Sequence, residues 1–280
     1  MNAGPSNVLV INPDELGQDP ARGMDLAVSL GVSWLEMRTA WGSNLLLLDN
    51  SSLERIKSET EARDLQVAAL AAPLWKWCRQ EATPGRVDSF GFPTRVPAQD
   101  RKAWIDRALT AAHLLGTTRV RVFSHLKVEP RLTEQLADDP LLPWALDRAE
   151  QAGVRLLLEN EPVCTVADPG ALLHVLTAHP RLGLWMDLGN LHEVGAADSG
   201  TITALAPYVE YVHIKDFRLH PEGRQFVPAG MGEVPYTKLL TVLRQERPGL
   251  PYALETHVKD DPASALAHGA AFLRRSLPGL

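Results

Sequence analysis

The chain has 280 residues, of which 45% are hydrophobic and 22% charged, and its formal net charge is −6. This composition excludes a disordered chain, and the negative charge argues against a general nucleic-acid binder, which needs basic residues to neutralise phosphates. Two cysteines, Cys78 and Cys164, are too few for a disulfide framework or a thiolate zinc site, which favours a reducing compartment. No apolar run approaches the roughly 20 residues that span a bilayer, and the first residues lack the pattern of a secretory signal. We therefore expect a cytoplasmic protein with neither nucleic acid nor membrane as a partner.

Short apolar runs rich in β-branched residues recur along the chain and predict eight strands. In chain order these runs are Val8–Ile11, Trp34–Met37, Val67–Ala71, Val120–Phe123, Val154–Leu158, Leu182–Met186, Tyr211–Ile214 and Tyr252–Leu254. Helical patterns lie between most of them, and the clearest is an apolar helix face between Trp104 and Leu115.

The boundaries of these elements also repeat. A glycine that tolerates the left-handed helix cap stands where a helix is expected to end, at Gly31, Gly116 and Gly153. An aspartate followed by proline, the pattern of a helix start, occurs at Asp19-Pro20, Asp139-Pro140, Asp168-Pro169 and Asp261-Pro262.

Eight strands that alternate with helices, at 35 residues per unit, predict a single-domain (β/α)₈ TIM barrel over residues 1–280. A doubly wound sheet is the alternative, but no G-x-G-x-x-G sequence follows the first strand. We expect the irregular stretch from Pro73 to Pro97 to form a loop over one face of the barrel.

Strand parity places a set of polar residues inside this barrel, because alternate residues of each strand point into the lumen. Four successive strands end in an inward polar residue at the carboxyl end, where barrel enzymes have their active sites: Glu159, Asp187, His213 and Glu255. Three carboxylates in one lumen repel one another and lose hydration, and a divalent cation resolves that conflict. The sequence therefore predicts a metal site.

Four segments around these residues resemble the xylose isomerase-like barrel superfamily: Leu158–Pro162, Trp185–Asn190, Val212–Asp216 and Leu254–His257. That superfamily includes sugar isomerases and epimerases, inosose-processing enzymes and metal-dependent abasic-site endonucleases. The resemblance implies that Glu159, Asp187, His213 and Glu255 bind one divalent metal ion. It also implies that the two glutamates form the catalytic acid/base pair.

This ligand set favours Mn²⁺, with Mg²⁺, Co²⁺ or Zn²⁺ as alternatives. A metal that chelates a carbonyl and its neighbouring hydroxyl acidifies the adjacent C–H group, so we expect a sugar or sugar phosphate isomerase or epimerase that works through an enediolate. An inosose-type dehydratase is the alternative, and a non-catalytic sugar-binding barrel is a third. An abasic-site endonuclease is disfavoured, because the chain has Pro73-Leu74-Trp75 and Phe217-Arg218-Leu219 where those enzymes carry further metal ligands.

Six further residues are candidates for substrate binding: Asn190, Lys215, His257, Glu36, His125 and Trp75. Asn190 stands where many relatives have histidine, and its amide suits a substrate hydroxyl. Lys215 and His257 contact the substrate or orient a metal ligand.

The other candidates have structural alternatives. Glu36 instead forms an ion pair with Arg121, His125 lies on a solvated loop, and Trp75 anchors a loop in the core. The glycine-containing loop Pro228–Pro235 either approaches a phosphate or is a tight turn. The expected partner is a small sugar or polyol, and a homo-oligomer is left open.

Overall fold

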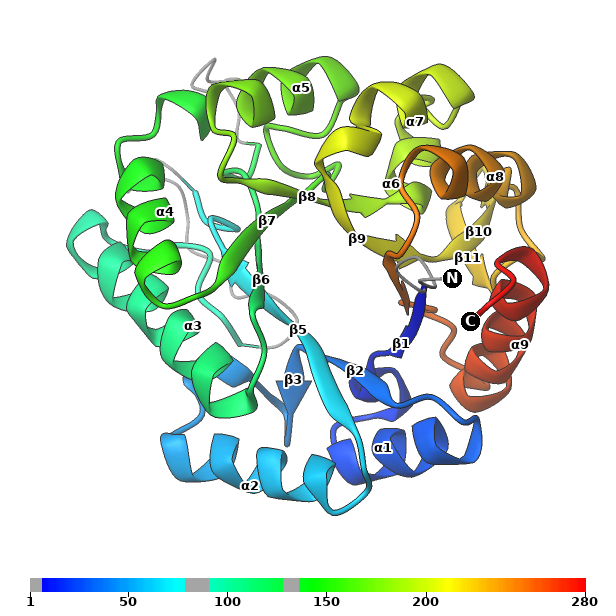
Figure 1. Cartoon of the computed structure of the whole chain (residues 1–280), viewed down its shortest axis with the longest axis horizontal. Helices are drawn as coiled ribbons and strands as arrows, with labels where there is room; N and C mark the ends of the chain where they lie inside the picture. Colours follow the sequence, from blue (N-terminus) through cyan, green and yellow to red (C-terminus); the bar gives the residue numbers. More distant parts are fainter. Residues whose placement is uncertain (1–6, 79–90, 128–135) are drawn as a thin grey trace, which may run out of the picture.

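A closed barrel of eight parallel strands forms the centre of the computed structural model, which describes residues 7–78, 91–127 and 136–280 (Figure 1). Neighbouring strands around the barrel follow the chain, and the last pairs with the first. They are β1 (Val8–Ile11), β2 (Trp34–Met37), β5 (Gln66–Leu74), β6 (Arg119–Val122), β7 (Arg155–Glu159), β8 (Gly183–Asp187), β9 (Val209–Ile214) and β12 (Pro251–Leu254). The predicted fold class and all eight predicted strands are confirmed.

Strands β1 and β2 have the predicted bounds, and the bounds of the other six strands differ from the prediction by at most three residues. The largest difference is at the end of β5. Strand β5 continues to Leu74, so the loop expected from Pro73 begins after it, and residues 79–90 of that loop lie outside the described residues.

Helices form a ring outside the barrel (Figure 1). They are α1 (Pro20–Ser29), α2 (Asn50–Glu61), α3 (Arg101–Leu115), α4 (Leu141–Gln151), α5 (Pro169–Ala178), α6 (Leu188–Glu193), α7 (Ser199–Leu205), α8 (Tyr236–Glu246) and α9 (Pro262–Ser276). Helix α3 buries the apolar face that the sequence pattern predicts. In the part of the chain that the structure describes, no helix has the length and apolarity needed to cross a membrane.

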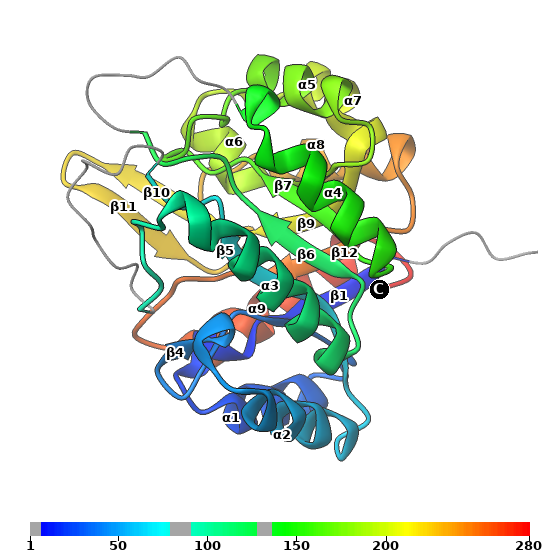
Figure 2. The same cartoon turned by 90° about the vertical axis from the view of Figure 1, so that its left-hand side faces the viewer.

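Two short hairpins extend from the carboxyl ends of the barrel strands. One pairs β3 (Thr39–Ala40) with β4 (Ser43–Asn44), and the other pairs β10 (Asp216–His220) with β11 (Gly223–Val227). The second hairpin projects beyond the barrel on the side opposite the C-terminus (Figure 2).

The predicted element boundaries follow local backbone chemistry. Gly31, Gly116 and Gly153 have φ values of 65°, 73° and 66°, the left-handed conformation that ends a helix at little cost for glycine. All four predicted aspartate caps accept a backbone N–H of their own helix, at Asp19, Asp139, Asp168 and Asp261. Asp139 has additional partners that bear on the site.

The core has two parts. The larger lies between the barrel and the helices. The smaller fills the lumen and consists of Val10, Ala68, Ala69, Ala71, Leu157, Trp185, Tyr211 and Ala253. The lumenal cluster confirms the strand parity, because Leu157, Trp185, Tyr211 and Ala253 each stand two positions before one of the inward polar residues. Apolar packing thus closes the lumen below and leaves the polar residues at the carboxyl ends of the strands.

Candidate metal centre

The structure brings the four predicted metal ligands together. Glu159 and Asp187 end β7 and β8, His213 lies in β9, and Glu255 follows β12. One ligand atom from each residue lies within 4.8 Å of the others, and all four residues are buried. The strand register produces this arrangement, because Asp187 pairs directly with His213 across β8 and β9.

The imidazole of His213 is oriented as a metal ligand would be. Its Nε2 lies 2.7 Å from Oε2 of Glu36, which fixes the proton on that nitrogen. Its Nδ1 is buried and has no hydrogen-bond partner among the described residues. That atom faces carboxylate oxygens of Glu159, Glu255 and Asp187 at 3.3, 3.4 and 3.7 Å. A buried nitrogen without a partner among three carboxylates fits a divalent cation, and this oxygen-rich set suits a hard ion.

Each carboxylate of the cluster also contacts a basic side chain. Nη1 of Arg121 donates to Oε2 of Glu159 at 2.9 Å, and Nη1 of Arg38 donates to Oε1 of Glu255 at 2.6 Å. Nζ of Lys215 lies 2.8 Å from Oδ2 of Asp187. The two glutamates therefore each have one oxygen held by an arginine and the other facing His213.

These contacts set the protonation states of the cluster. Burial acts to raise the pKa of Glu159, Asp187 and Glu255, but the neighbouring positive groups outweigh it and lower all three pKa values. Burial acts to lower the pKa of Lys215, but Asp187 and Glu255 outweigh it and raise that pKa. At neutral pH the site therefore contains three ionised carboxylates and an ammonium group.

The prediction of an ion pair between Arg121 and Glu36 is wrong. Arg121 donates to the backbone carbonyls of Ala71 and Ala72 on β5, which directs its remaining nitrogen to Glu159 on β7. Glu36 instead accepts from His213. Parity correctly placed both side chains in the lumen, but it does not determine which of several charged neighbours they contact.

A cavity of about 170 Å³ opens beside the cluster. It is lined by Arg38, Asn44, Pro73, Lys76, Arg121, Phe123, Glu159, Glu161, Lys215, Glu255 and His257. The sequence reasoning missed Arg38, Lys76 and Glu161 as site residues. Inward parity pointed to Arg38 and Glu161, whereas no sequence signal marks Lys76.

Two of the predicted substrate-binding residues, Lys215 and His257, line this cavity. Nε2 of His257 lies 3.3 Å from Oε2 of Glu255, and its backbone has a φ of 53°, an uncommon conformation for a non-glycine residue. Glu36 lies behind His213 and does not line the cavity. Asn190 is buried, and its backbone N–H donates to Oδ1 of Asp187. Its side-chain amide has no hydrogen-bond partner among the described residues.

Trp75 and His125 lie outside the cavity lining, and both contact Asp139 instead. Nε1 of Trp75 and Nε2 of His125 lie 2.9 and 3.0 Å from Oδ2 of Asp139. Burial acts to raise the pKa of Asp139, but these hydrogen bonds and the N–H of Leu141 lower it to about 2. The trio ties the loops after β5 and β6 to the start of α4.

The glycine-containing loop Pro228–Pro235 forms a tight turn around a carboxylate of its own chain. Asp216 accepts the backbone N–H groups of Gly230 and Gly232 at 2.9 Å and that of Val234 at 3.2 Å. A Cβ at Gly232 would lie 2.1 Å from the Asp216 side chain, so only glycine fits. These amides are therefore occupied, and the tight-turn alternative describes the loop.

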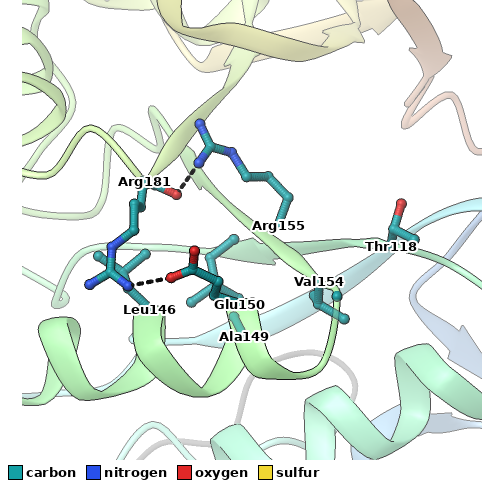
Figure 3. Close-up of a pocket in the computed structure, with 9 residues that line it drawn as sticks. Thr118, Leu146, Ala149, Glu150, Val154, Arg155 and Arg181 are labelled. Carbon is teal, nitrogen blue, oxygen red and sulfur yellow. Dashed lines mark hydrogen bonds and ion pairs between the residues drawn. The ribbon is translucent and has the colours of Figure 1, made fainter.

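A hollow of about 470 Å³ lies at the opposite end of the barrel, beside the C-terminal part of α4 and the start of β7 (Figure 3). Its two arginines contact groups of the protein itself. Arg181 pairs with Glu150 and Asp147, and Arg155 pairs with Glu210. Potential metal ligands converge at the carboxyl end, so the candidate site lies there.

Comparison with known proteins defines the class of this barrel. A family model described as a xylose isomerase-like TIM barrel matches residues 24–276. The chain belongs to the xylose isomerase-like TIM barrel family. A search of curated proteins finds no significant match.

Solved structures with this fold include proteins of several activities. IolI, described with a bound zinc atom, superposes with a TM-score of 0.76 at 16% identity, over 96% of this chain and 98% of that one. D-allulose 3-epimerase from Methylomonas sp., in complex with D-allulose, superposes with a TM-score of 0.72 at 14% identity, over 99% of both chains. A probable 3-DHS dehydratase, AsbF from Bacillus anthracis, superposes with a TM-score of 0.71 at 15% identity, over 95% of this chain and 98% of that one. At these identities the similarity shows the shared fold.

Proposed function

We propose that this protein is a divalent-metal-dependent isomerase or epimerase that transfers a proton next to the carbonyl of a small sugar or sugar phosphate. The observation that carries the proposal is the convergence of Glu159, Asp187, His213 and Glu255, with Nδ1 of His213 aimed at three carboxylates. Glu36 supports it, because a ligand histidine commonly donates its other N–H to a carboxylate. Mn²⁺ is the ion we propose, since three carboxylates and one imidazole suit it.

A bound divalent ion supplies the positive charge that stabilises an enediolate. The protein supplies the proton transfer. Glu159 and Glu255 approach the cluster from β7 and β12, which β8 and β9 separate in the barrel. Their lowered pKa values keep them ionised at neutral pH, so either is ready to accept a proton. One glutamate removes the proton beside the carbonyl and the other returns a proton to that carbon or its neighbour.

Other side chains are proposed to bind and orient the substrate. Lys215 and His257 face it from the cavity wall. Asn190 offers an amide without a partner to a substrate hydroxyl. Trp75 and His125 support the site from behind, through Asp139, and do not touch the substrate. A cytoplasmic location is a prediction from the sequence, and a homo-oligomeric state is left open.

A dehydratase that uses the same metal site is the second candidate. Nζ of Lys215 and Nε2 of His257 lie 3.7 and 3.3 Å from Oε2 of Glu255. Such a pair of N–H groups beside the proposed base provides a proton for a leaving hydroxyl. A dehydratase would release water and produce a new enone absorbance.

The test is deuterium exchange followed by NMR in D₂O, with Mn²⁺-loaded protein and a panel of ketoses, ketose phosphates and inososes. We expect deuterium to enter the carbon next to the carbonyl of at least one compound. Glu159→Gln and Glu255→Gln should each reduce exchange at least 100-fold while the metal stays bound, in line with the usual size of acid–base contributions of about 10² to 10⁴.

Two controls locate the effect. Asp187→Asn and His213→Ala should lose the metal together with the exchange, whereas Glu150→Gln, at the opposite end of the barrel, should change neither. Unchanged turnover by metal-free protein would refute the proposal.

A further inference from the structure

The outer part of the cavity contains an ion pair that the proposed chemistry does not use. Nζ of Lys76, which follows β5, lies 3.1 Å from Oε2 of Glu161, which follows β7. The same ammonium lies 4.5 Å from the centre of the Phe123 ring. The two side chains are 27% and 20% exposed, more than any ligand of the cluster, so they lie toward solvent. A substrate held at the cluster would reach them with its distal end.

The other basic groups of the lining are already matched by carboxylates. Arg121 contacts Glu159, and Lys215 contacts Asp187. Arg38 is shared by three acids, since it contacts Asp14 through two nitrogens and also reaches Glu15 and Glu255. Among the described residues, every basic side chain of the lining therefore already has an acidic partner. None is left to bind the phosphate of a substrate.

A charge count leads to the same conclusion. The acids that line the cavity or contact its lining are Asp14, Glu15, Glu159, Glu161, Asp187 and Glu255. The arginines and lysines of the lining are Arg38, Lys76, Arg121 and Lys215. Six carboxylates against four cations leave two negative charges, which a divalent ion neutralises. Proton transfer from substrate to a glutamate does not change this total, whereas a phosphate dianion would add two negative charges that no cation in this count offsets.

The loop that could have held a phosphate is also unsuitable. The N–H groups of Gly230, Gly232 and Val234 donate to the buried carboxylate of Asp216. A helix start or glycine loop binds phosphate through N–H groups that have no other acceptor. Here the Asp216 carboxylate already accepts these N–H groups, so they are not free to bind a phosphate.

We propose that the site selects an uncharged polyhydroxy carbonyl compound over its phosphate ester, and that the Lys76–Glu161 pair determines this specificity. The inference rests on the proposed function and narrows its substrate class. A hydroxyl can accept from Lys76 and donate to Glu161, so it joins the pair without breaking it. A phosphate dianion can bind only Lys76, and it then places two negative charges beside Glu161.

The experiment compares matched compounds on Mn²⁺-loaded protein. D-fructose and D-fructose 6-phosphate, and D-ribulose and D-ribulose 5-phosphate, are assayed for deuterium exchange by NMR and for binding by calorimetry. We expect the free ketose of a pair to have at least tenfold higher kcat/KM and tighter binding than its ester. An ester that is exchanged or bound as well as the free sugar would overturn the inference.

The Glu161→Gln variant tests whether the Lys76–Glu161 pair causes the preference for the free ketose. It removes the repelling charge and keeps the hydrogen-bonding shape, so the preference for the free ketose should shrink about tenfold. Glu150→Gln, which removes a paired glutamate at the other end of the barrel, is the matched control and should leave the preference intact. A preference that Glu161→Gln leaves unchanged would refute the role of the pair.

The outcomes separate this inference from the proposed function. Binding of the free ketose in preference to the ester, without exchange of either, supports the substrate class and contradicts the isomerase. Exchange of the ester in preference to the free ketose supports the isomerase and contradicts the substrate class. If the protein binds none of the compounds and exchanges none of them, the result contradicts both the substrate class and the isomerase.

Discussion

The two ends of the barrel carry the same kind of ion pair in different surroundings. At the carboxyl end, Arg121 and Glu159 have side chains only 7% and 2% exposed. At the amino end, Arg155 and Glu210 are 36% and 25% exposed (Figure 3 shows Arg155). Water screens the second pair, whereas the first is desolvated and depends on its partners.

This difference explains why the smaller hollow, and not the larger one, is the candidate site. At the amino end, carboxylates and arginines pair on the surface, and the described residues of that hollow include no potential ligand without a partner. At the carboxyl end, three buried carboxylates converge on one imidazole nitrogen. Burial, more than residue type, distinguishes a candidate metal centre from a surface ion pair.

The largest expected effect concerns the buried pair. In chelator-treated protein, Arg121→Met should lower the free energy of unfolding by about 3–5 kcal/mol, because it leaves Glu159 buried without its counter-charge. Arg155→Met should lower the free energy of unfolding by about 1 kcal/mol or less. Denaturant unfolding measures both. Saturating Mn²⁺ should recover part of the Arg121→Met loss, and equal losses for the two variants would remove the distinction between the ends.

The second prediction concerns Asp139, which lies at the carboxyl end. Its pKa of about 2 is below the value of about 3.9 for an unfolded aspartate, so its stabilising effect is present above pH 4 and is lost as the pH falls toward 2. At pH 7 we expect Asp139→Asn to be less stable than the parent by about 2 kcal/mol. The difference should shrink as unfolding is measured from pH 5 to pH 3. A difference that is constant with pH would contradict the contribution of its charge.

The third prediction concerns the carboxylate behind the metal ligand. Glu36→Gln should weaken Mn²⁺ binding about tenfold, or about 1.4 kcal/mol, because Nε2 of His213 then donates to a neutral oxygen. Glu210→Gln, in the exposed pair at the amino end, should leave the affinity unchanged. Competition with a metal chelator measures both. An unaltered affinity in Glu36→Gln would show that the contact does not orient the ligand.

The smallest expected effect is at the amino end. Arg181 pairs with Asp147 and Glu150 on the surface, and its side chain is 45% exposed. Arg181→Met should leave the denaturation midpoint, the Mn²⁺ affinity and the substrate preference within experimental error of the parent. A clear loss in any of these would mean that the exposed ion pairs at the amino end contribute to stability, metal binding or substrate preference.

Local patterns were sufficient to predict the fold. The eight strands depend on short apolar runs, and the helix ends depend on glycines such as Gly116 and caps such as Asp168, all of which act within a few residues. The four proposed ligands follow from strand alternation, because a period of two fixes which side chains face the lumen. Parity assigned His213 and Glu255 to the same lumen although they lie on different strands.

Contacts between distant strands were not predictable in the same way. Parity placed Arg121 and Glu36 in the lumen but not their partners, and Trp75 gave no sign that it would turn away to Asp139. Long side chains reach across several strands, so their contacts depend on the closed three-dimensional arrangement.

The sequence by itself therefore determined the barrel, the end of the barrel at which the candidate site lies and the four residues proposed to hold the metal. Only the tertiary structure decided which cations neutralise which carboxylates, that Asp216 occupies the amides of its glycine loop, and that Lys76 meets Glu161 at the cavity. The physical reason is that hydrophobic periodicity acts locally along the chain. Charge pairing in a buried site depends on distances that exist only once the barrel has closed.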